Sequence, residues 1–246
     1  MMRRFFFEPN DRNGKTVFLS EEESYHLVKV LRLSKGATVE LLDGSGFVYS
    51  ATVTATGRRV ELHIEAIVSK DEGKEQIIWV GQSVLKGDKM DTVVQKCTEL
   101  GVTRMTPLRS SRCQGKLNAK QSLKKHERWR RISLAACKQC LRNRQLQLDM
   151  PVSYTEWLDE VDGCAESVRL LFWEEEKKVR LQDIPGLNNN QPVVLLLGPE
   201  GGFSMEEVEQ AREMGWITVS LGKRILRAET ATLTAVSIVQ YLTGSL

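Results

Sequence analysis

Apolar and polar positions alternate with a period of two through most of the first seventy residues. Around a DGSG turn, the alternating apolar residues are Val39, Leu41, Phe47, Tyr49, Ala51 and Val53. Residues 60–64 repeat the alternation. This pattern is typical of strands that bury one face. It predicts a small half-buried sheet or barrel.

One short helix interrupts this β-rich part. Ser20 is a good N-cap, and Glu23 stands three residues later, which predicts a capping box. His26, Leu27 and Val30 follow at helical spacing. A charged linker is expected at residues 69–75, so the predicted domains are residues 1–72 and 73–246.

After the linker, continuous apolar runs alternate with amphipathic helices. Strands are expected at QIIWVGQSVL, VTRMTPL, QLQLDMPV, VRLLFW and PVVLLLG, with helices between them, including a long basic one at residues 118–143. Strands without polar alternation are typical of a parallel sheet covered on both faces. The second domain is therefore predicted to be α/β.

The last segment, residues 230–246, has no charged side chain. A helix without a charged face is poorly suited to solvent, and this one is too short and too rich in Thr and Ser to span a membrane. Two interpretations remain open. The helix is buried within its own domain, or it is buried between two subunits.

Charge is concentrated in one part of the chain. Residues 101–150 contain 13 Lys and Arg but two Asp and Glu, a net charge of +11 in a chain whose total is +3. On the long helix, Lys120, Lys124, Arg128, Arg131, Lys138 and Arg142 fall on one side, opposite Trp129, Ile132 and Ala136. Because solvated faces usually mix signs, this stripe favours phosphate contacts on a nucleic acid.

Other sequence features exclude several classes of protein. The five cysteines have no framework spacing, and the CxxC at Cys137 and Cys140 lies within a helix, so reduced thiols are expected rather than zinc or redox chemistry. The three histidines lie in unrelated contexts, and no metal site is expected. No run reaches transmembrane length and the start lacks a signal-peptide core, which predicts a cytoplasmic protein.

The stretch LLLGPEGGFS combines a strand, a glycine-rich turn and a helix start. Its spacing is not that of a nucleotide-phosphate loop, and Glu200 would repel a polyphosphate. Ser204 and Glu207 form a predicted capping box, but that does not explain Gly198, Gly201 and Gly202. Three glycines would allow a ligand to approach the backbone closely. The turn is therefore expected to form one side of a ligand pocket.

A second loop, LGKRILRAETATLTA, follows the next strand, which also ends in Leu-Gly. The two loops are expected side by side, forming an apolar pocket lined by backbone. Arg227 and Glu229 are its polar residues just before the uncharged helix. A salt bridge or a helix-start carboxylate would also explain Glu229.

These two motifs, at this spacing, closely resemble the SPOUT methyltransferases, in particular the RsmE family, which methylates N3 of a uridine in 16S ribosomal RNA. KGDKMDTVVQKCTELGV, SSRC, AACKQCLRNR and HLVKVLRL match as well, so the resemblance spans nearly the whole chain. It implies a PUA-like β-barrel that docks RNA, followed by an α/β SPOUT domain with a deep trefoil knot, in a homodimer that acts on 16S ribosomal RNA or the small ribosomal subunit.

The resemblance also implies that S-adenosyl-L-methionine is held by three loops, residues 172–174, 197–201 and 221–231. The residues so assigned to the cofactor are Phe172, Leu197, Gly198, Pro199, Glu200, Gly201, Leu221, Gly222, Ile225, Leu226, Arg227, Thr230 and Ala231. Those assigned to RNA are Arg112, Arg128, Arg131, Lys138, Gln139, Arg142 and Arg144.

The expected chemistry is alignment of the uridine nitrogen with an activated methyl group and removal of its proton. Arg227 is the candidate for positioning or stabilising the uridine anion, and Glu229 or Glu200 is the candidate base. Two other functions remain open: a non-catalytic RNA-binding protein, and a SPOUT methyltransferase that acts on another nucleotide or on a ribose 2'-hydroxyl.

Overall fold

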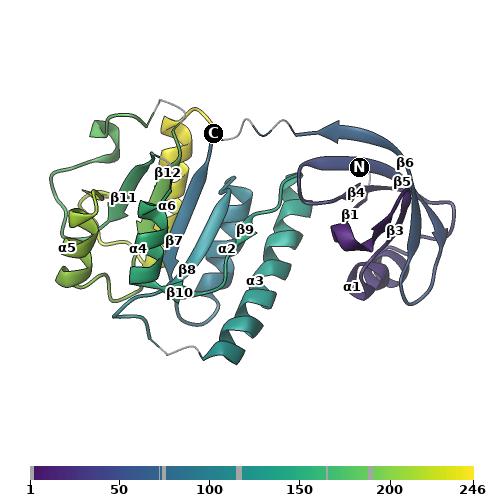
Figure 1. The fold of residues 1–246 in the computed structure, drawn as a ribbon, viewed down its shortest axis with the longest axis horizontal. Helices are drawn as coiled ribbons and strands as arrows, with labels where there is room; N and C mark the ends of the chain where they lie inside the picture. Colours follow the sequence, from purple (N-terminus) through teal and green to yellow (C-terminus); the bar gives the residue numbers. More distant parts are fainter. Residues whose placement is uncertain (1–2, 72, 74–75, 115–117, 165, 188–190) are drawn as a thin grey trace. The chain divides into compact units, whose positions relative to one another are not determined.

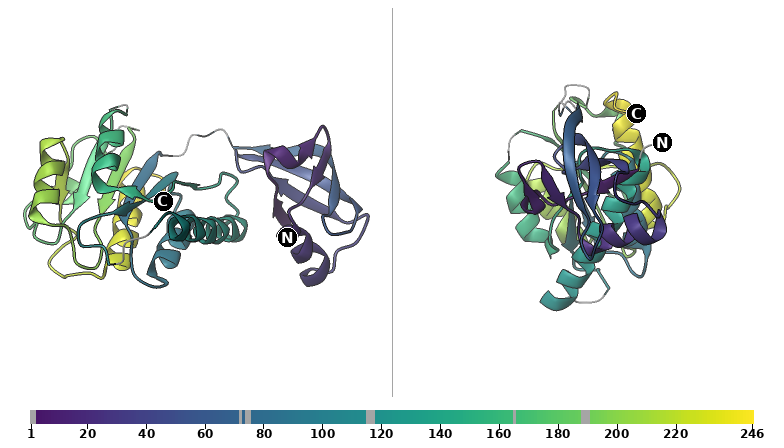
Figure 2. Two further views of the ribbon diagram at one scale, coloured as in Figure 1. Left: turned by 60° about the horizontal axis from the view of Figure 1, so that its bottom comes forward. Right: turned by 90° about the vertical axis from the view of Figure 1, so that its right-hand side faces the viewer.

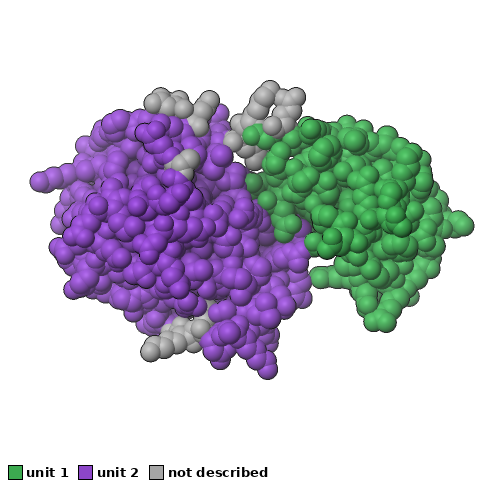
Figure 3. Space-filling view, in the orientation of Figure 1, with its two compact units in different colours: residues 1–74, 137–145 green, residues 75–136, 146–246 purple. Residues whose placement is uncertain are grey.

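The structure is a computed structural model that describes residues 3–71, 73, 76–114, 118–164, 166–187 and 191–246 (Figure 1). The chain divides into two compact units (Figure 3). Unit 1 comprises residues 1–74 and 137–145, and unit 2 comprises residues 75–136 and 146–246. Cys137–Gln145, at the end of the long basic helix, thus belongs to the same unit as the β-rich part. Three residues of the expected linker, 72, 74 and 75, lie outside the described residues.

Unit 1 contains a six-stranded sheet with the order β1-β4-β5-β6-β3-β2. Its strands are β1 (Arg4–Phe6), β2 (Arg12–Asn13), β3 (Thr16–Phe18), β4 (Thr38–Leu42), β5 (Phe47–Ala55) and β6 (Glu61–Lys70). β1 pairs with β4 in parallel, and the other pairs are antiparallel. The two longest strands, β5 and β6, lie side by side (Figures 1 and 2). The alternating positions Val39, Leu41 and Ala51 are fully buried, as the pattern predicted.

The short helix of unit 1 begins as predicted and then widens. α1 (Glu21–Tyr25) continues into a π-helical turn, η2 (His26–Val30), and a one-turn 3-10 helix, η1 (Pro9–Asp11), precedes them. Ser20 caps α1 by accepting the Glu23 amide. The reciprocal half of the expected capping box was wrong, because the Glu23 carboxylate accepts from the Lys138 ammonium at 2.6 Å instead.

Unit 2 contains a seven-stranded parallel sheet with the order β10-β8-β7-β12-β11-β13, in which β9 pairs with β8. The strands are β7 (Ile78–Ser83), β8 (Arg104–Arg109), β9 (Gln147–Leu148), β10 (Val152–Ser153), β11 (Val168–Phe172), β12 (Val193–Leu197) and β13 (Ile217–Val219). The helices are α2 (Lys89–Glu99), α3 (Ala119–Cys140), α4 (Tyr154–Asp162), η3 (Leu181–Asp183), α5 (Met205–Glu213) and α6 (Ala228–Leu242).

Both faces of this sheet are covered, which explains its continuous apolar strands. Leu195 and Leu197 pack with α2 and α6, whereas Val194 and Leu196 pack with α4 and α5 (Figure 1). A strand buried on both faces has no position for a polar side chain to reach solvent. The predicted α/β fold is thereby confirmed. The trefoil knot stays a prediction.

The long basic helix and the terminal helix both bury one face. In α3, Trp129 and Ala136 are buried and Arg131 is exposed, as the stripe predicted. In α6, Val236 is fully buried, but Tyr241 on the other face is 70% exposed. α6 therefore packs in its own domain along one face and leaves a second face at the surface.

The cysteines are free thiols in the described part of the chain. Cys97 is fully buried in α2, and desolvation raises the pKa of its thiol to about 12. Such a thiol stays protonated and unreactive at neutral pH.

Candidate active site

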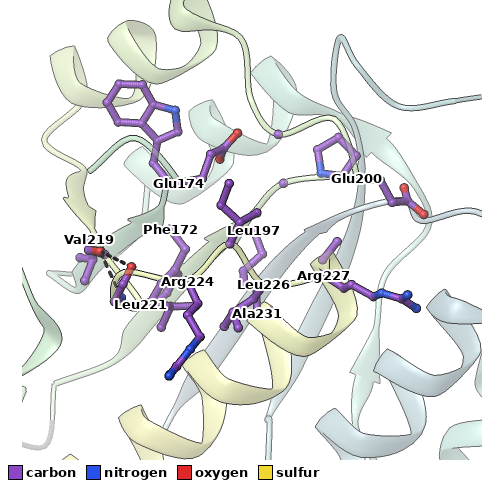
Figure 4. A pocket seen from close by; sticks show the side chains of 18 of the residues that line it. Phe172, Glu174, Leu197, Glu200, Val219, Leu221, Arg224, Leu226, Arg227 and Ala231 are labelled. Carbon is purple, nitrogen blue, oxygen red and sulfur yellow. Dashed lines mark hydrogen bonds between the residues drawn. The ribbon is translucent and has the colours of Figure 1, made fainter. Parts of the chain in front are cut away.

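A pocket of about 470 Å3 opens at the carboxyl ends of three neighbouring strands of unit 2. Phe172 ends β11 and Leu197 ends β12, while Val219 ends β13, and β11 lies between the other two (Figure 4). The two Leu-Gly loops line one pocket, as expected, although β11 lies between the strands that they follow. The pocket joins all three loops, because the ends of parallel strands meet at one edge of the sheet.

Most residues assigned to the cofactor from the sequence line this pocket. Phe172, Leu197, Leu221, Leu226 and Ala231 supply apolar side chains, and Gly198, Pro199, Glu200, Gly222, Ile225 and Arg227 complete the set. Gly201 and Thr230 are not among the lining residues. The lining also includes five further residues of the three expected loops, which are Trp173, Glu174, Lys223, Arg224 and Ala228. Four lining residues lie outside those loops, which are Lys89, Gly202, Val219 and Ser220.

The glycine-rich turn packs against other parts of the protein at all three glycines. A Cβ at Gly198 would lie 3.3 Å from the Phe203 ring, and one at Gly201 would lie 3.3 Å from Cβ of Arg112. At Gly202, where φ is +65°, a Cβ would collide with the carboxylate of Glu174. The glycines thus do have a local structural explanation, contrary to the sequence-based interpretation.

Four hydrogen bonds from other parts of the chain fix this turn. The buried Gln82 amide at the end of β7 donates to the Gly198 carbonyl at 3.2 Å, and it accepts from the Thr232 hydroxyl of α6. Arg112 donates to the Gly201 carbonyl at 3.0 Å. Glu200 accepts from the backbone amide of Lys86 at 3.1 Å and from the Lys89 ammonium at 3.0 Å. The turn is therefore held in place before any ligand binds.

Glu200 is held as an anion by these contacts. Partial burial acts to raise its pKa, but the hydrogen bonds from Lys89 and from backbone amides outweigh burial and lower the pKa overall. A carboxylate with a lowered pKa is a weak proton acceptor at neutral pH. Glu200 is thus better suited to anchoring the turn than to acting as the base.

Glu229 stands in the first turn of α6, outside the lining of the pocket. Its Oε2 atom is buried, accepts no hydrogen bond within the described residues, and lies 3.9 Å from the Lys89 ammonium. The alternative reading of Glu229 as a helix-start carboxylate in an ion pair matches this position. Arg227, by contrast, is exposed at the N-cap of α6 and lines the pocket (Figure 4).

The residues assigned to RNA differ in their exposure and in their contacts. Arg112, Arg128, Arg131 and Gln139 are exposed, and Arg112 donates to the Gly201 carbonyl. Arg128 donates to Asp91 at 2.8 Å, Lys138 pairs with Glu23, and Arg144 pairs with Asp71 at 3.0 Å. Arg142 lies in the same short segment of unit 1 and is partly buried. The acidic residues that pair with these cations lie in distant parts of the sequence. The composition of the helix, which is almost entirely basic, therefore could not reveal them.

Two known protein families match the chain. A family described as the RNA methyltransferase domain matches residues 72–240, and one described as the RNA methyltransferase PUA domain matches residues 19–65. Ribosomal RNA small subunit methyltransferase E (RsmE) from Aquifex aeolicus is 33% identical over 235 residues, which are 94% of this chain and 97% of that relative. The chain belongs to the RsmE family of RNA methyltransferases.

Solved structures of similar proteins cover the chain at nearly full length. The RsmE protein of Neisseria gonorrhoeae, crystallised with S-adenosyl methionine, is 35% identical with a TM-score of 0.88 over 98% of both chains. A methyltransferase from Legionella pneumophila with bound cofactor is 32% identical with the same TM-score and coverage. The expected PUA and α/β SPOUT domains of an RsmE-family protein are thereby confirmed.

Proposed function

We propose that this RsmE-family chain transfers a methyl group from S-adenosyl-L-methionine to N3 of a uridine in 16S ribosomal RNA. The observation that carries the proposal is the pocket at the ends of β11, β12 and β13 in a chain of this family. Support for the cofactor comes from the Neisseria relative, whose structure contains S-adenosyl methionine. Support for the substrate comes from the names of the relatives, which are small-subunit ribosomal RNA methyltransferases.

The residues present fit this cofactor. A volume of about 470 Å3 is within the range of small-molecule pockets, and apolar side chains such as Phe172 and Leu226 suit a purine ring. The lining also carries charges of both signs, with Glu174 and Glu200 against Lys223, Arg224 and Arg227. A zwitterionic nucleoside needs both signs in its site. When bound, it supplies a sulfonium methyl group that is already activated for transfer.

The chain's own contribution is to hold a uridine and favour loss of its N3 proton. Arg227 is the residue for this role because it is cationic, exposed and part of the pocket lining. A guanidinium beside the uracil oxygens stabilises the anion that forms when N3 loses its proton. Glu229 lies 3.9 Å from the Lys89 ammonium and outside the pocket lining, which favours an ion pair over the role of base. Water is then the proton acceptor.

RNA would bind through exposed cations of unit 2. Lys120, Lys124 and Arg131 lie on the exposed side of α3, and Arg112 contacts the turn of the pocket. Lys and Arg on one face are suited to phosphate contacts. The uridine must leave its stack to reach the pocket. Unit 1, as the PUA domain, would add contacts to the same RNA.

The exposed face of α6 supports the proposal of a homodimer. Tyr241 and Ile238 are apolar or aromatic side chains at the surface of a helix that lacks charge beyond its first turn. We place the protein in the cytoplasm, where its substrate is assembled. In the described residues, no helix has the length and apolarity needed to cross a membrane, and no cluster of metal-ligating side chains occurs.

Methylation of 16S ribosomal RNA from a strain that lacks the gene tests the function. The purified protein with S-adenosyl-L-methionine should add one methyl group per RNA, and mass mapping should place it on the uracil ring. Arg227→Ala should lower kcat about 100-fold or more, as removal of a charge-stabilising donor does elsewhere. A methyl group on a ribose would contradict the N3 assignment. Absence of cofactor binding, measured by calorimetry, would favour the non-catalytic alternative.

A further inference from the structure

Glu174 presents a carboxylate to the pocket directly after β11. It lines the pocket, and within the described part of the chain it makes neither a hydrogen bond nor an ion pair with another residue. The other lining carboxylate, Glu200, is already occupied by Lys86 and Lys89. Glu174 is therefore the acidic group of the pocket that is available to a ligand.

The backbone around Glu174 is fixed by its neighbours. The Trp173 amide donates to the Val219 carbonyl at 3.2 Å. The Glu176 carboxylate accepts from the Lys178 amide and from the Thr218 hydroxyl, both at 2.8 Å. These contacts lower the pKa of Glu176, with the Lys178 amide as the largest cause. The turn that carries Glu174 is thus attached on both sides.

The opposite wall leaves room for the Glu174 side chain. Gly202 has a φ of +65°, and a Cβ there would collide with Oε1 of Glu174. The two loops therefore fit together, because the loop after β12 has a glycine where the loop after β11 places the Glu174 carboxylate. The Glu174 carboxylate is exposed and lies directly against the backbone of Gly202.

Charge and apolar surface are distributed along the pocket around this carboxylate. In the view of Figure 4, Glu174 and Arg224 lie on opposite sides of the apolar side chains of Phe172 and Leu197. The cations Lys223, Arg224 and Arg227 all come from the loop after β13. The pocket thus has a carboxylate at one side, an apolar middle and a cationic loop at the other side.

We propose that Glu174 binds the ribose hydroxyls of the methyl donor and so selects an adenine ribonucleoside. An ionised carboxylate is an acceptor only and can receive both hydroxyls of a ribose, as acidic residues do in other nucleotide sites. The apolar middle then receives the base, and Lys223 and Arg224 of the cationic loop receive the carboxylate of the methionine part. This inference rests on the proposed use of S-adenosyl-L-methionine.

Calorimetry with ligands that differ at the ribose tests the inference. The probes are S-adenosyl-L-methionine, 5'-methylthioadenosine, which lacks the ammonium and carboxylate, and 5'-methylthio-2'-deoxyadenosine. The wild type should bind the deoxy probe about tenfold or more weakly than its ribose form, the loss expected for one hydrogen bond to a charged group. Glu174→Gln should bind both ribose ligands correspondingly more weakly and discriminate little between the ribose and deoxy probes.

Glu175→Gln is the matched control, because Glu175 is exposed, adjacent and outside the pocket lining. It should bind every probe like the wild type. Equal affinity of the wild type for the two methylthio probes would overturn the inference. So would a Glu174→Gln defect confined to S-adenosyl-L-methionine, since that result would place the ammonium group on Glu174. If the wild type binds no S-adenosyl-L-methionine at all, the proposed function fails first.

Discussion

The Lys89 ammonium lies 3.0 Å from Oε1 of Glu200, across the rim of the pocket. The same ammonium lies 3.9 Å from Oε2 of Glu229. One cation at the start of α2 therefore links the glycine-rich turn to the start of α6. Both carboxylates were candidate bases, and both lie within 4 Å of this one ammonium.

Glu200→Gln should loosen the turn without unfolding the protein. The Lys89–Glu200 pair is partly exposed, so its loss should lower the free energy of unfolding by no more than about 1 kcal/mol. The affinity for S-adenosyl-L-methionine should fall more clearly, because Gly198 and Pro199 beside Glu200 line the pocket. Thermal unfolding and calorimetry on the same samples measure the two effects. A large loss of stability with unchanged affinity would contradict a local anchoring role.

The contribution of Glu200 to stability should depend on pH in a defined direction. Its pKa is lower in the folded protein than the ordinary value, so its stabilisation is fully present above that ordinary value and is lost as pH falls through the folded pKa. The stability difference between the wild type and Glu200→Gln should therefore shrink on acidification below about pH 4. Chemical unfolding at a series of pH values between neutral and strongly acidic measures this difference. A stability difference that stays constant over the whole pH range would exclude ionised Glu200 as its source.

Gly202→Ala should impair ligand binding beyond its cost to the backbone. Positive φ costs a non-glycine residue about 1 kcal/mol. Gly215→Ala is the matched control, since Gly215 has a φ of +79° and its Cβ would meet nothing within 4 Å. Both variants should lose stability in chemical denaturation, but only Gly202→Ala should bind S-adenosyl-L-methionine more weakly. Equal affinities for the two variants would show that the Glu174 contact is unimportant.

Gly81→Ala should be among the most destabilising small substitutions in unit 2. A Cβ at Gly81 would collide with the ring of Trp157, which is fully buried between Trp79 and Trp216. Overpacking of a tight core costs typically about 1–3 kcal/mol. Chemical denaturation should show this loss, and Gly163→Ala, whose Cβ would make only 3.7 Å contacts, should stay within about 0.5 kcal/mol of the wild type.

Much of the fold could be predicted from periodicity, because a buried face requires apolar residues at regular spacing along the sequence. Residues 193–197 are apolar at every position, and the structure buries them on both faces of the sheet. The Ser204 capping box could be predicted for the same reason, since its two members are three residues apart. Local patterns of this kind need no knowledge of the tertiary arrangement.

Contacts between residues far apart in the sequence could not be predicted in this way, because they produce no local sequence pattern. Nothing in the sequence indicates that β11 lies between β12 and β13, or that buried Gln82 binds the Gly198 carbonyl. Asp91, which neutralises Arg128, is 37 residues away from it. The sequence therefore predicted a uniform row of charges for the proposed RNA-binding stripe, although Arg128 is paired with Asp91 and Lys138 with Glu23.

Arg131 and Arg128 should differ in their effect on RNA binding. Arg131 is exposed, and Arg131→Gln should weaken binding and reduce the slope of log affinity against log salt by about one. Arg128→Gln should change that slope less, because Asp91 and Asp88 already compensate the Arg128 charge. Titrations with a 16S ribosomal RNA fragment at several salt concentrations compare the two. The same change in slope for both variants would mean that RNA displaces Asp91 from Arg128.

Tyr241→Glu should separate the two copies of the proposed homodimer. Tyr241 is 70% exposed on α6, whereas Val236 and Val239 on the opposite face are fully buried within the domain. A carboxylate at an apolar interface remains without a partner and costs several kcal/mol, so the dimer should dissociate. Light scattering at micromolar concentration should then give the mass of one chain, with the thermal stability of the monomer retained. Tyr25→Glu, at another exposed tyrosine in unit 1, is the control and should leave the mass unchanged. A wild type that is already monomeric would reject the interface role of α6.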